Sequence, residues 1–543
     1  MALVTIDGHT FEVPDGENVI QAAARIGIHI PHYCFHSGLP IDGNCRMCLV
    51  EVEGARGLQV ACNTVLRKKV DKDGNEIPAA VVRQDTEQVR QARAGVMEFE
   101  LLNHPTDCVV CDQAGECGLQ DYYMTVGKYD HRSKVPKVEK RKAVPIGPMV
   151  MLDQERCILC SRCVRFVNTV TKTGELTIAG RGDKCRIEIF PGVELDNDYS
   201  GNVVDLCPVG ALTSRDFRFK KRVWFLKTTP SICTGCSKGC NVLVDQDLAV
   251  VHRYRPRYNP HVNQWWMCDR GRLSYKAIND GRLKRARVAG DPAPWQKAVD
   301  TALALLRGKK FGIVVGPHAS LEDLWMARAL GREFEAPLWG LSWLAPGKAD
   351  EWLMKSDLAP DRKGFELLGI STAEAAFRAA APGLDALIAL DVDLPSDLAS
   401  GGQDAAGALA PTRGPALIAL STHETETATQ AAVALPLAVA AERFATWANC
   451  DGRVQKGVAA FDPPGDALGA RELLGLLAAR LGKPVPADLE EVWRELGSEL
   501  GITAVTFADI PLEGLPTATG AACAVSEPDT FGTGAGTIGG LPR

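Results

Sequence analysis

Cysteine spacing constrains this chain more than any other feature of its sequence. Between residues 34 and 268 stand fifteen cysteines at short, regular intervals, with Cys185 outside the pattern. Together with His104, the fifteen sort into four groups of four. Eighteen cysteines in 543 residues are too few for a disulfide scaffold and too clustered to be scattered core thiols. The pattern therefore predicts metal or iron–sulfur centres, with the rest of the chain as support, shielding or docking surface.

Length and composition indicate a multidomain protein of a reducing compartment. A chain of 543 residues is too long to fold around a single hydrophobic core, so three or more domains are expected. The net charge of −6 disfavours nucleic acid as a partner. The first residues lack a basic stretch followed by an apolar one, and no apolar run reaches the roughly 18 residues of a spanning helix. We expect no signal peptide, and membrane attachment only through partners.

The first group lies in an irregular loop. Its spacing is C-x10-C-x2-C-x13-C, formed by Cys34, Cys45, Cys48 and Cys62. Four thiolates can hold two irons, two to each, and Gly38 and Gly43 let backbone amides turn toward sulfide. A zinc site usually pairs two C-x2-C hairpins, whereas only one is present here. The group predicts a [2Fe–2S] cluster, in a variant of the plant-type ferredoxin pattern with a longer first gap.

The second group follows a helix predicted over residues 84–103, whose apolar positions are Val89, Val96, Phe99 and Leu102. Its spacing is H-x3-C-x2-C-x5-C, formed by His104, Cys108, Cys111 and Cys117. A lone histidine is more often a surface or core residue, but here it opens a cysteine run. Three cysteines and one histidine also suit zinc, so the group alone leaves the metal open. Its place among other cluster groups favours [4Fe–4S], with a potential raised by the neutral imidazole.

The third group is a ferredoxin run with half of its pattern missing. A C-x2-C-x2-C run lacks the usual fourth cysteine, because Val167 takes that position. A Cys–Pro pair stands forty-four residues after the run, at Cys207 and Pro208. The positions where a second run would lie hold no thiolates; they are Val203, Ser200 and Asn197. The prediction is one retained [4Fe–4S] site, formed by Cys157, Cys160, Cys163 and Cys207.

The fourth group encloses a predicted hairpin. Its spacing is C-x2-C-x3-C-x27-C, formed by Cys233, Cys236, Cys240 and Cys268. Gly235 and Gly239 permit tight turns around a cube. The spacing favours a third cubane-type [4Fe–4S] cluster, and a zinc ribbon-like knuckle is the alternative. The remaining thiol of this half, Cys185, falls on an alternating pattern that predicts a buried position on a strand.

Outside the four groups, the sequence predicts ordinary structural elements. Residues 3–6 and 10–13 read as a hairpin with an Asp7–Gly8 turn. The segment 128–142 carries seven Lys or Arg, which suits either an acidic partner or a solvated loop. Beyond residue 290, apolar runs alternate with helical patterns and predict parallel α/β units; the runs are 309–320, 384–393 and 414–422, and the helices 295–308 and 321–334. Gly534, Gly536 and Gly539 match G-x-G-x-x-G but lack a preceding strand and a following helix, so they predict no dinucleotide site.

In this order, the four spacings resemble the family of the G subunit of bacterial NADH–quinone oxidoreductase (respiratory complex I), the large iron–sulfur subunit of its peripheral arm. The resemblance covers residues 1–275, and residues 278–515 are more loosely similar to the molybdopterin-oxidoreductase fold. The matching residues of that second stretch are Glu442, Thr446, Asn449, Gly452, Arg453, Gln455, Pro463, Pro464 and Gly465. The stretch is far shorter than in molybdenum enzymes, and Cys450 and Cys523 stand in contexts unsuited to a molybdenum ligand. Molybdopterin is therefore not expected.

The resemblance implies a multidomain chain that is α+β and then α/β. It places ferredoxin-like iron–sulfur domains in the N-terminal half and a molybdopterin-oxidoreductase-like α/β domain in the C-terminal half. The expected boundaries are 1–80 for a [2Fe–2S] ferredoxin-like domain, 81–125 for a His/Cys-ligated [4Fe–4S] domain, 140–220 for a ferredoxin-like [4Fe–4S] domain, 221–277 for a molybdopterin-oxidoreductase-type [4Fe–4S] domain, 278–515 for a degenerate α/β domain and 516–543 for a flexible tail.

The resemblance also implies an electron-transfer subunit without a substrate site of its own. Electrons would pass from a flavin subunit through the Cys34, Cys157 and His104 groups toward quinone, with the Cys233 group off the main route. The implied partners are an NADH/FMN-binding flavoprotein subunit, a ferredoxin-like two-cluster subunit and a quinone-site subunit, at the cytoplasmic face of the inner membrane. A formate dehydrogenase or NAD-linked hydrogenase subunit, and a zinc-knuckle interaction protein, are the alternatives.

Overall fold

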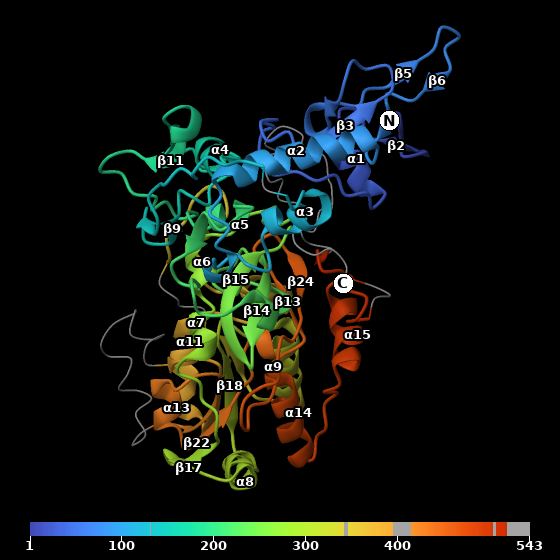
Figure 1. Ribbon diagram of the computed structural model, residues 1–543. Helices are drawn as coiled ribbons and strands as arrows, with labels where there is room; N and C mark the ends of the chain where they lie inside the picture. Colours follow the sequence, from blue (N-terminus) through green and yellow to red (C-terminus); the bar gives the residue numbers. More distant parts are fainter. Residues whose placement is uncertain (131, 342–345, 395–413, 503–505, 518–543) are drawn as a thin grey trace. The chain divides into compact units, whose positions relative to one another are not determined.

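The structure is a computed structural model that describes residues 1–130, 132–341, 346–394, 414–502 and 506–517. Cys523, the glycine motif of residues 534–539 and residues 518–543 of the expected tail lie outside this description. The described chain forms two compact units, Met1–Leu226 and the part from Lys227 onward. Figure 1 traces both units along the sequence.

The first unit opens with a five-stranded sheet of order β2-β1-β7-β3-β4. Its strands are β1 (Ala2–Ile6), β2 (His9–Val13), β3 (Leu49–Val52), β4 (Gln59–Val60) and β7 (Val81–Arg83). The predicted hairpin is confirmed: β1 pairs antiparallel with β2, and Asp7 and Gly8 turn between them with φ of 47° and 86°. Helix α1 (Val19–Arg25) is held by a capping box of Asn18 and Gln21 and buries its apolar face against the sheet.

Two helices frame the second cysteine group. They are α2 (Glu87–Asn103) and α3 (Gly118–Val126). The predicted helix over 84–103 is confirmed, but its predicted apolar face is wrong at Phe99, which is 75% exposed. The buried face instead carries Val89, Arg93 and Met97, four residues apart and therefore on one side of the helix. Phe99 lies two residues from Met97, which points it away from that side.

The basic segment folds back along α2. Lys137 donates from Nζ to the carbonyls of Leu101 and Leu102, at 2.7 and 3.1 Å, and so satisfies the C-terminal end of the helix. Arg132 forms an ion pair with Glu98 on the same helix. Part of the basic segment therefore packs against α2, with two of its basic side chains paired to that helix.

The third cysteine group lies in a small α+β region. Its elements are β8 (Val144–Pro145), β9 (Val150–Leu152), β10 (Leu176–Ala179), β11 (Arg186–Ile189), β12 (Leu212–Ser214), α4 (Arg162–Arg165), with a π-helical continuation over Phe166–Val170, and α5 (Asn202–Leu206). The predictions for Cys185 are wrong: it is only partly buried and directly precedes β11. A turn of helix over Gly182–Lys184 ends at Cys185, which interrupts the alternating pattern before the strand begins.

The second unit begins with a meander of three antiparallel strands, β13 (Lys227–Ile232), β14 (Asn241–Asp247) and β15 (Val250–Pro256). The hairpin predicted inside the fourth group is β14–β15. Two short helices follow, α6 (Asp269–Leu273) and α7 (Lys276–Asn279).

A seven-stranded sheet forms the centre of the second unit (Figure 1). In spatial order its strands are β17 (Asp291–Pro292), β16 (Arg287–Val288), β22 (Val433–Pro436), β21 (Ala416–Ser421), β20 (Ala386–Leu390), β18 (Phe311–Val315) and β19 (Leu338–Gly340). The five strands from β22 to β19 are parallel, which confirms the predicted α/β units. Because β18 and β20 are buried on both faces, they read as continuous apolar runs in the sequence.

Helices pack on both faces of this sheet. One face carries α8 (Trp295–Leu306), α9 (Leu321–Glu333), α14 (Ala470–Arg480) and α15 (Leu489–Glu499). The other face carries α11 (Glu374–Ala380) and α13 (Glu426–Gln430). A three-stranded sheet beside it, β23 (Ala445–Ala448), β24 (Arg453–Gly457) and β25 (Leu515–Pro516), reaches the fourth cysteine group.

Candidate metal centres

The first group brings its thiols close together. The Cys34 thiol lies within hydrogen-bond distance of the thiols of Cys45 and Cys62, and the Cys48 thiol within that distance of Cys62. The backbone N–H of Cys34 also donates to Cys45 Sγ at 3.4 Å. These hydrogen bonds lower the pKa of Cys34 below its ordinary value. The loop before β3 turns at Gly43, with φ of 70°, as the sequence predicted for an irregular cradle.

The second group combines three neighbouring thiols with a neutral histidine. Cys117 directly precedes α3, and burial raises its pKa to about 11. The neighbouring thiols of Cys111 and Cys108 add to this rise, and backbone N–H groups of α3 oppose it. His104 follows the last residue of α2 and is 8% exposed, and its buried Nδ1 has no hydrogen-bond partner among the described residues. Burial lowers the pKa of His104 to about 4, so the ring is neutral at pH 7, as a metal ligand must be. An orphaned nitrogen on a neutral ring fits ligation of a cluster.

The third group combines two buried thiols, Cys160 and Cys163, with two half-buried ones, Cys157 and Cys207. Burial raises the pKa of Cys160 to about 11. Desolvation also raises the pKa of the half-buried Cys207, while backbone N–H groups of Val209, Leu212 and Ala211 hydrogen-bond to its sulfur and oppose that rise. Amides directed at sulfur are the donors that an anionic cluster requires. Leu159 and Ser161 adopt φ of 53° and 61°, which curves the C-x2-C-x2-C loop.

The second and third groups meet at one backbone contact. Gly118, next to Cys117, donates its N–H to the carbonyl of Pro208, next to Cys207, at 2.9 Å. A Cβ on Gly210 would lie 2.2 Å from the sulfur of Cys111, so only glycine leaves room for that thiol. The segment that follows Cys207 therefore contacts both the second and the third group.

Two arginines join the first and third groups. Arg165 donates through Nη2 to the carbonyl of Cys34, and to that of Cys160 at 3.3 Å. Arg162 donates to the carbonyls of Phe35 and Leu206, which adjoin Cys34 and Cys207. Our sequence predictions missed both residues. An arginine inside and another just after a C-x2-C-x2-C run is the signal that marks them.

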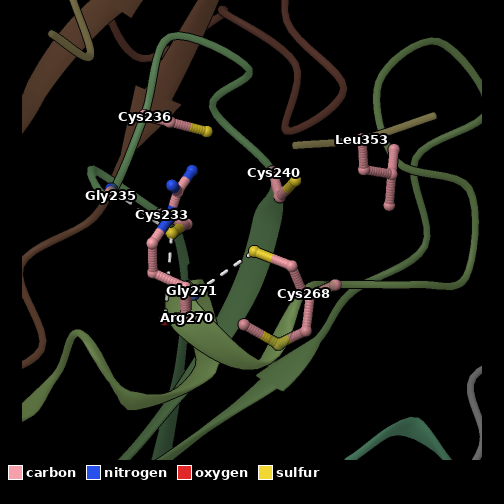
Figure 2. A pocket seen from close by; sticks show the side chains of 9 residues that line it. Cys233, Gly235, Cys236, Cys240, Cys268, Arg270, Gly271 and Leu353 are labelled. Carbon is pink, nitrogen blue, oxygen red and sulfur yellow. Dashed lines mark hydrogen bonds between the residues drawn. The ribbon is translucent and has the colours of Figure 1, made fainter. Parts of the chain in front are cut away.

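The four thiols of the fourth group line one cavity. Figure 2 shows Cys233, Cys236, Cys240 and Cys268 around it, with Arg270 and Leu353 also in its wall. The N–H groups of Gly235 and Gly271 donate to the sulfurs of Cys233 and Cys268, at 3.4 and 3.3 Å. A Cβ on Gly271 would lie 3.1 Å from Cys233 Sγ, so this glycine keeps the wall clear.

The β23–β24 turn holds the loop of the fourth group. Asn449 Nδ2 donates to the carbonyl of Lys238 at 3.3 Å, and Gln455 Nε2 to that of Gly239 at 2.9 Å. The Cys450 N–H donates to the carbonyl of Ser237 at 2.7 Å. Asn449 and Gln455 belong to the stretch that resembles the molybdopterin-oxidoreductase fold. In this chain their contacts position the cysteine loop.

The donor sets suit iron–sulfur clusters, because three groups supply four thiols each and the second supplies three thiols with His104. Within the described ranges, no three His, Cys, Asp or Glu side chains gather closely enough to hold one metal ion. Zinc holds thiolates at about 2.3 Å, which draws all four sulfurs together. In a [4Fe–4S] cube each ligand binds a different iron, so the ligands stand further apart.

Family models match four consecutive parts of the chain. They describe a 2Fe-2S iron-sulfur cluster binding domain over residues 2–71, an NADH-ubiquinone oxidoreductase-G iron-sulfur binding region over 93–132, the ferredoxin-like domain of NADH-quinone oxidoreductase subunit 3 over 147–213, and a molybdopterin oxidoreductase Fe4S4 domain over 226–280. The G subunit of NADH-quinone oxidoreductase from Rickettsia conorii is 36% identical over 337 residues, covering 61% of this chain and 49% of the relative. The aligned 61% of this chain is similar to that protein.

Relatives from other genera match this chain to a similar extent. The corresponding G subunit of Streptomyces coelicolor is 37% identical over 334 residues, covering 60% of this chain and 39% of the relative. The mitochondrial NADH-ubiquinone oxidoreductase 78 kDa subunit of Neurospora crassa is 38% identical over 347 residues, covering 61% and 45%. The chain thus spans about half the length of the curated relatives that it matches, or less. A crystal structure of NAD+-reducing [NiFe]-hydrogenase matches 41% of this chain and 91% of its own at 26% identity, with a TM-score of 0.35, too low to indicate a shared fold.

These matches confirm the predicted order of domain types. Ferredoxin-like iron–sulfur domains come first, and an Fe4S4 domain of the molybdopterin-oxidoreductase type follows them. Domains for both 2Fe-2S and 4Fe-4S clusters are present, while the number of clusters stays a prediction. Among the described helices, none is both long and apolar enough to cross a membrane.

Proposed function

We propose that this chain is an iron–sulfur electron-transfer subunit of a proton-pumping NADH:quinone oxidoreductase. It would hold one [2Fe–2S] cluster on the Cys34 group and three [4Fe–4S] clusters on the His104, Cys157 and Cys233 groups. Each bound cluster supplies a centre that accepts and releases one electron. The flavoprotein, two-cluster and quinone-site subunits would be its partners and would hold it at the cytoplasmic face of the membrane.

One observation carries the proposed relay: the Cys157 group is hydrogen-bonded to both of its neighbours. Arg165 bridges the carbonyls of Cys34 and Cys160. On the other side, the Gly118 N–H and the Pro208 carbonyl connect Cys117 with Cys207. These two contacts support a middle position for the Cys157 group, between the Cys34 and His104 groups.

The protein around these groups suits a relay rather than a catalyst. Buried thiols and fixed backbone contacts surround the groups, so little has to move when an electron passes. The Cys233 group belongs to the second compact unit, and its loop is held by residues of that same unit. This separate support favours a place off the main route.

The test disables one group at a time in the complete complex. Cys163→Ser removes a ligand of the Cys157 group, and Cys240→Ser is the matched change in the Cys233 group. With NADH as reductant, we expect Cys163→Ser to leave the Cys34 group reducible and to slow reduction of the His104 group by at least about tenfold. Cys240→Ser should leave both rates unchanged. Rates are read from the EPR signals of each cluster after rapid freezing.

Dithionite provides the control, because it reduces each cluster directly and shows that the His104 group still holds one. Reduction of the His104 group by NADH at the unaltered rate in Cys163→Ser would overturn the proposed order. Copurification with a molybdenum-containing catalytic subunit, without flavoprotein and quinone-site subunits, would overturn the proposed function.

A further inference from the structure

A buried arginine of the first unit has no acidic partner among the residues that the structure describes. Arg162 is 5% exposed, and burial lowers its pKa. Among the described residues its guanidinium donates only to two carbonyl oxygens, those of Phe35 and Leu206, and its Nε has no partner. The ionisable groups that interact with it include the thiols of Cys160 and Cys34, the phenol of Tyr122, the guanidinium of Arg165 and the imidazoles of His32 and His36. None of these is a carboxylate.

Such a charge is costly unless something nearby is negative. A buried cation is normally paired, because desolvation disfavours it and neutral carbonyls compensate only part of the loss. A second guanidinium, that of Arg165, adds repulsion. The missing negative charge has to come from a group bound next to Arg162.

The position of Arg162 identifies that group. One end of its fork contacts the residue after Cys34, and the other contacts the residue before Cys207. In sequence it lies between Cys160 and Cys163. Thiolate-ligated clusters at the Cys34 and Cys157 groups would each place negative charge close to this guanidinium.

We propose that Arg162 is the shared counter-charge of the Cys34 and Cys157 groups and stabilises the reduced form of both clusters. The proposal rests on the clusters of the proposed function, but not on their reduction by NADH. Reduction adds one electron to a cluster, and no bond forms or breaks. Arg162 is charged before and after, so it takes up no proton. Its effect is to raise both potentials together while keeping their difference nearly constant.

The experiment compares three variants of the full chain with its clusters in place. Arg162→Gln removes the charge, and Arg162→Lys keeps it without the fork. Arg46→Gln is the matched control, because Arg46 lies between two ligands of the Cys34 group but is exposed, where water and salt screen its charge. Each protein is titrated with dithionite, and the EPR signals of the two clusters report the fraction reduced.

We expect Arg162→Gln to shift the reduction equilibrium of both clusters about tenfold toward the oxidised form, which is about 59 mV for a one-electron couple. Arg162→Lys should keep both reduction potentials close to those of the unaltered chain. Arg46→Gln should shift neither potential by more than about a third of the shift expected for Arg162→Gln. Unchanged potentials in Arg162→Gln, with both clusters present by iron content, would overturn the proposal. An equal shift in Arg162→Lys would also overturn it, because the fork and not the charge would then matter.

Loss of cluster is also informative. If Arg162→Gln fails to retain both clusters while Arg162→Lys retains them, the charge is required and the proposal stands. If Arg162→Lys loses them as well, the role of Arg162 is structural and the proposal fails. Clusters that titrate as expected with dithionite but are not reduced by NADH in the complex would refute the proposed function alone.

Discussion

Two buried arginines, one in each compact unit, are neutralised in different ways. Arg282 of the second unit forms two bonds of 2.7 Å to Glu442, and both side chains are at most 2% exposed. Arg162 of the first unit is buried as well, but among the described residues it contacts carbonyl oxygens only. Arg282 is thus balanced by a residue of its own unit, whereas Arg162 has no carboxylate among the described residues.

The missing carboxylate at Arg162 is not a property of the whole first unit. Arg156, near the second cysteine group, is also buried, and it pairs with Asp107 at 2.6 Å and Asp153 at 3.5 Å. Of these three buried arginines, Arg162 alone has no carboxylate, and it lies between the Cys34 and Cys157 groups. Arg93 is also buried and donates to Gln84 Oε1 and the Leu49 carbonyl rather than to a carboxylate, so the contrast concerns Arg162, Arg156 and Arg282.

The largest effect is expected where the second unit loses its internal balance. Glu442→Gln would leave Arg282 buried without a counter-charge and should lower the free energy of unfolding by about 3–5 kcal/mol. Glu366→Gln is the control, because Glu366 pairs with Lys363 at the surface and should cost at most about 1 kcal/mol. Denaturant unfolding measures both. Equal losses in the two variants would contradict the comparison.

Adding a negative charge at a cysteine group of the first unit tests the first unit's half of the comparison. His104→Cys replaces a neutral ligand by a thiolate and should lower the potential of that cluster by on the order of 100 mV, with iron content unchanged. The EPR-detected midpoint measures the shift, and the Cys34 group in the same sample serves as the internal reference. An unaffected cluster would show that His104 is not a ligand.

The pH dependence of unfolding tests the charge balance around Asp245 in the second unit. Burial opposes ionisation of this carboxyl, but Arg255 and Arg253 outweigh it and lower its pKa to about 2. Because the folded pKa lies below the unfolded value of 3.8, its contribution is complete above pH 3.8 and is lost as pH falls toward 2. The contribution is about 2 kcal/mol. Asp245→Asn should remove this pH dependence of unfolding, and exposed Asp300→Asn should keep it.

The smallest effect concerns the loop of the fourth group. Gln455→Ala removes the bond to the Gly239 carbonyl and another from Asn241 Nδ2, at 2.6 Å. We expect a loss of about 1–2 kcal/mol and a changed EPR line shape for the Cys233 group alone. Gln430→Ala, at an exposed helical position, is the matched control. A change confined to the other groups would contradict the assigned role of the β23–β24 turn.

The sequence was sufficient wherever local spacing decides the structure. Buried parallel strands such as β18 are apolar on both faces, and the β1–β2 turn has a fixed dipeptide signature, so both could be predicted. Phe99 could not be placed, because α2 follows a face set by its packing neighbours. Arg162 was missed because its partners lie 127 and 44 residues away and are backbone carbonyls, which leave no mark on the sequence.

The metal content of the full chain decides whether the four groups hold the proposed clusters. One two-iron and three four-iron clusters require about fourteen irons per chain, with a matching amount of acid-labile sulfide. The measurement is iron, sulfide, zinc and molybdenum analysis of the anaerobically purified full chain, separated from its partners. We predict about fourteen irons from this chain and neither zinc nor molybdenum bound to it. Stoichiometric molybdenum, or zinc in place of most of the iron, would contradict the four-cluster arrangement.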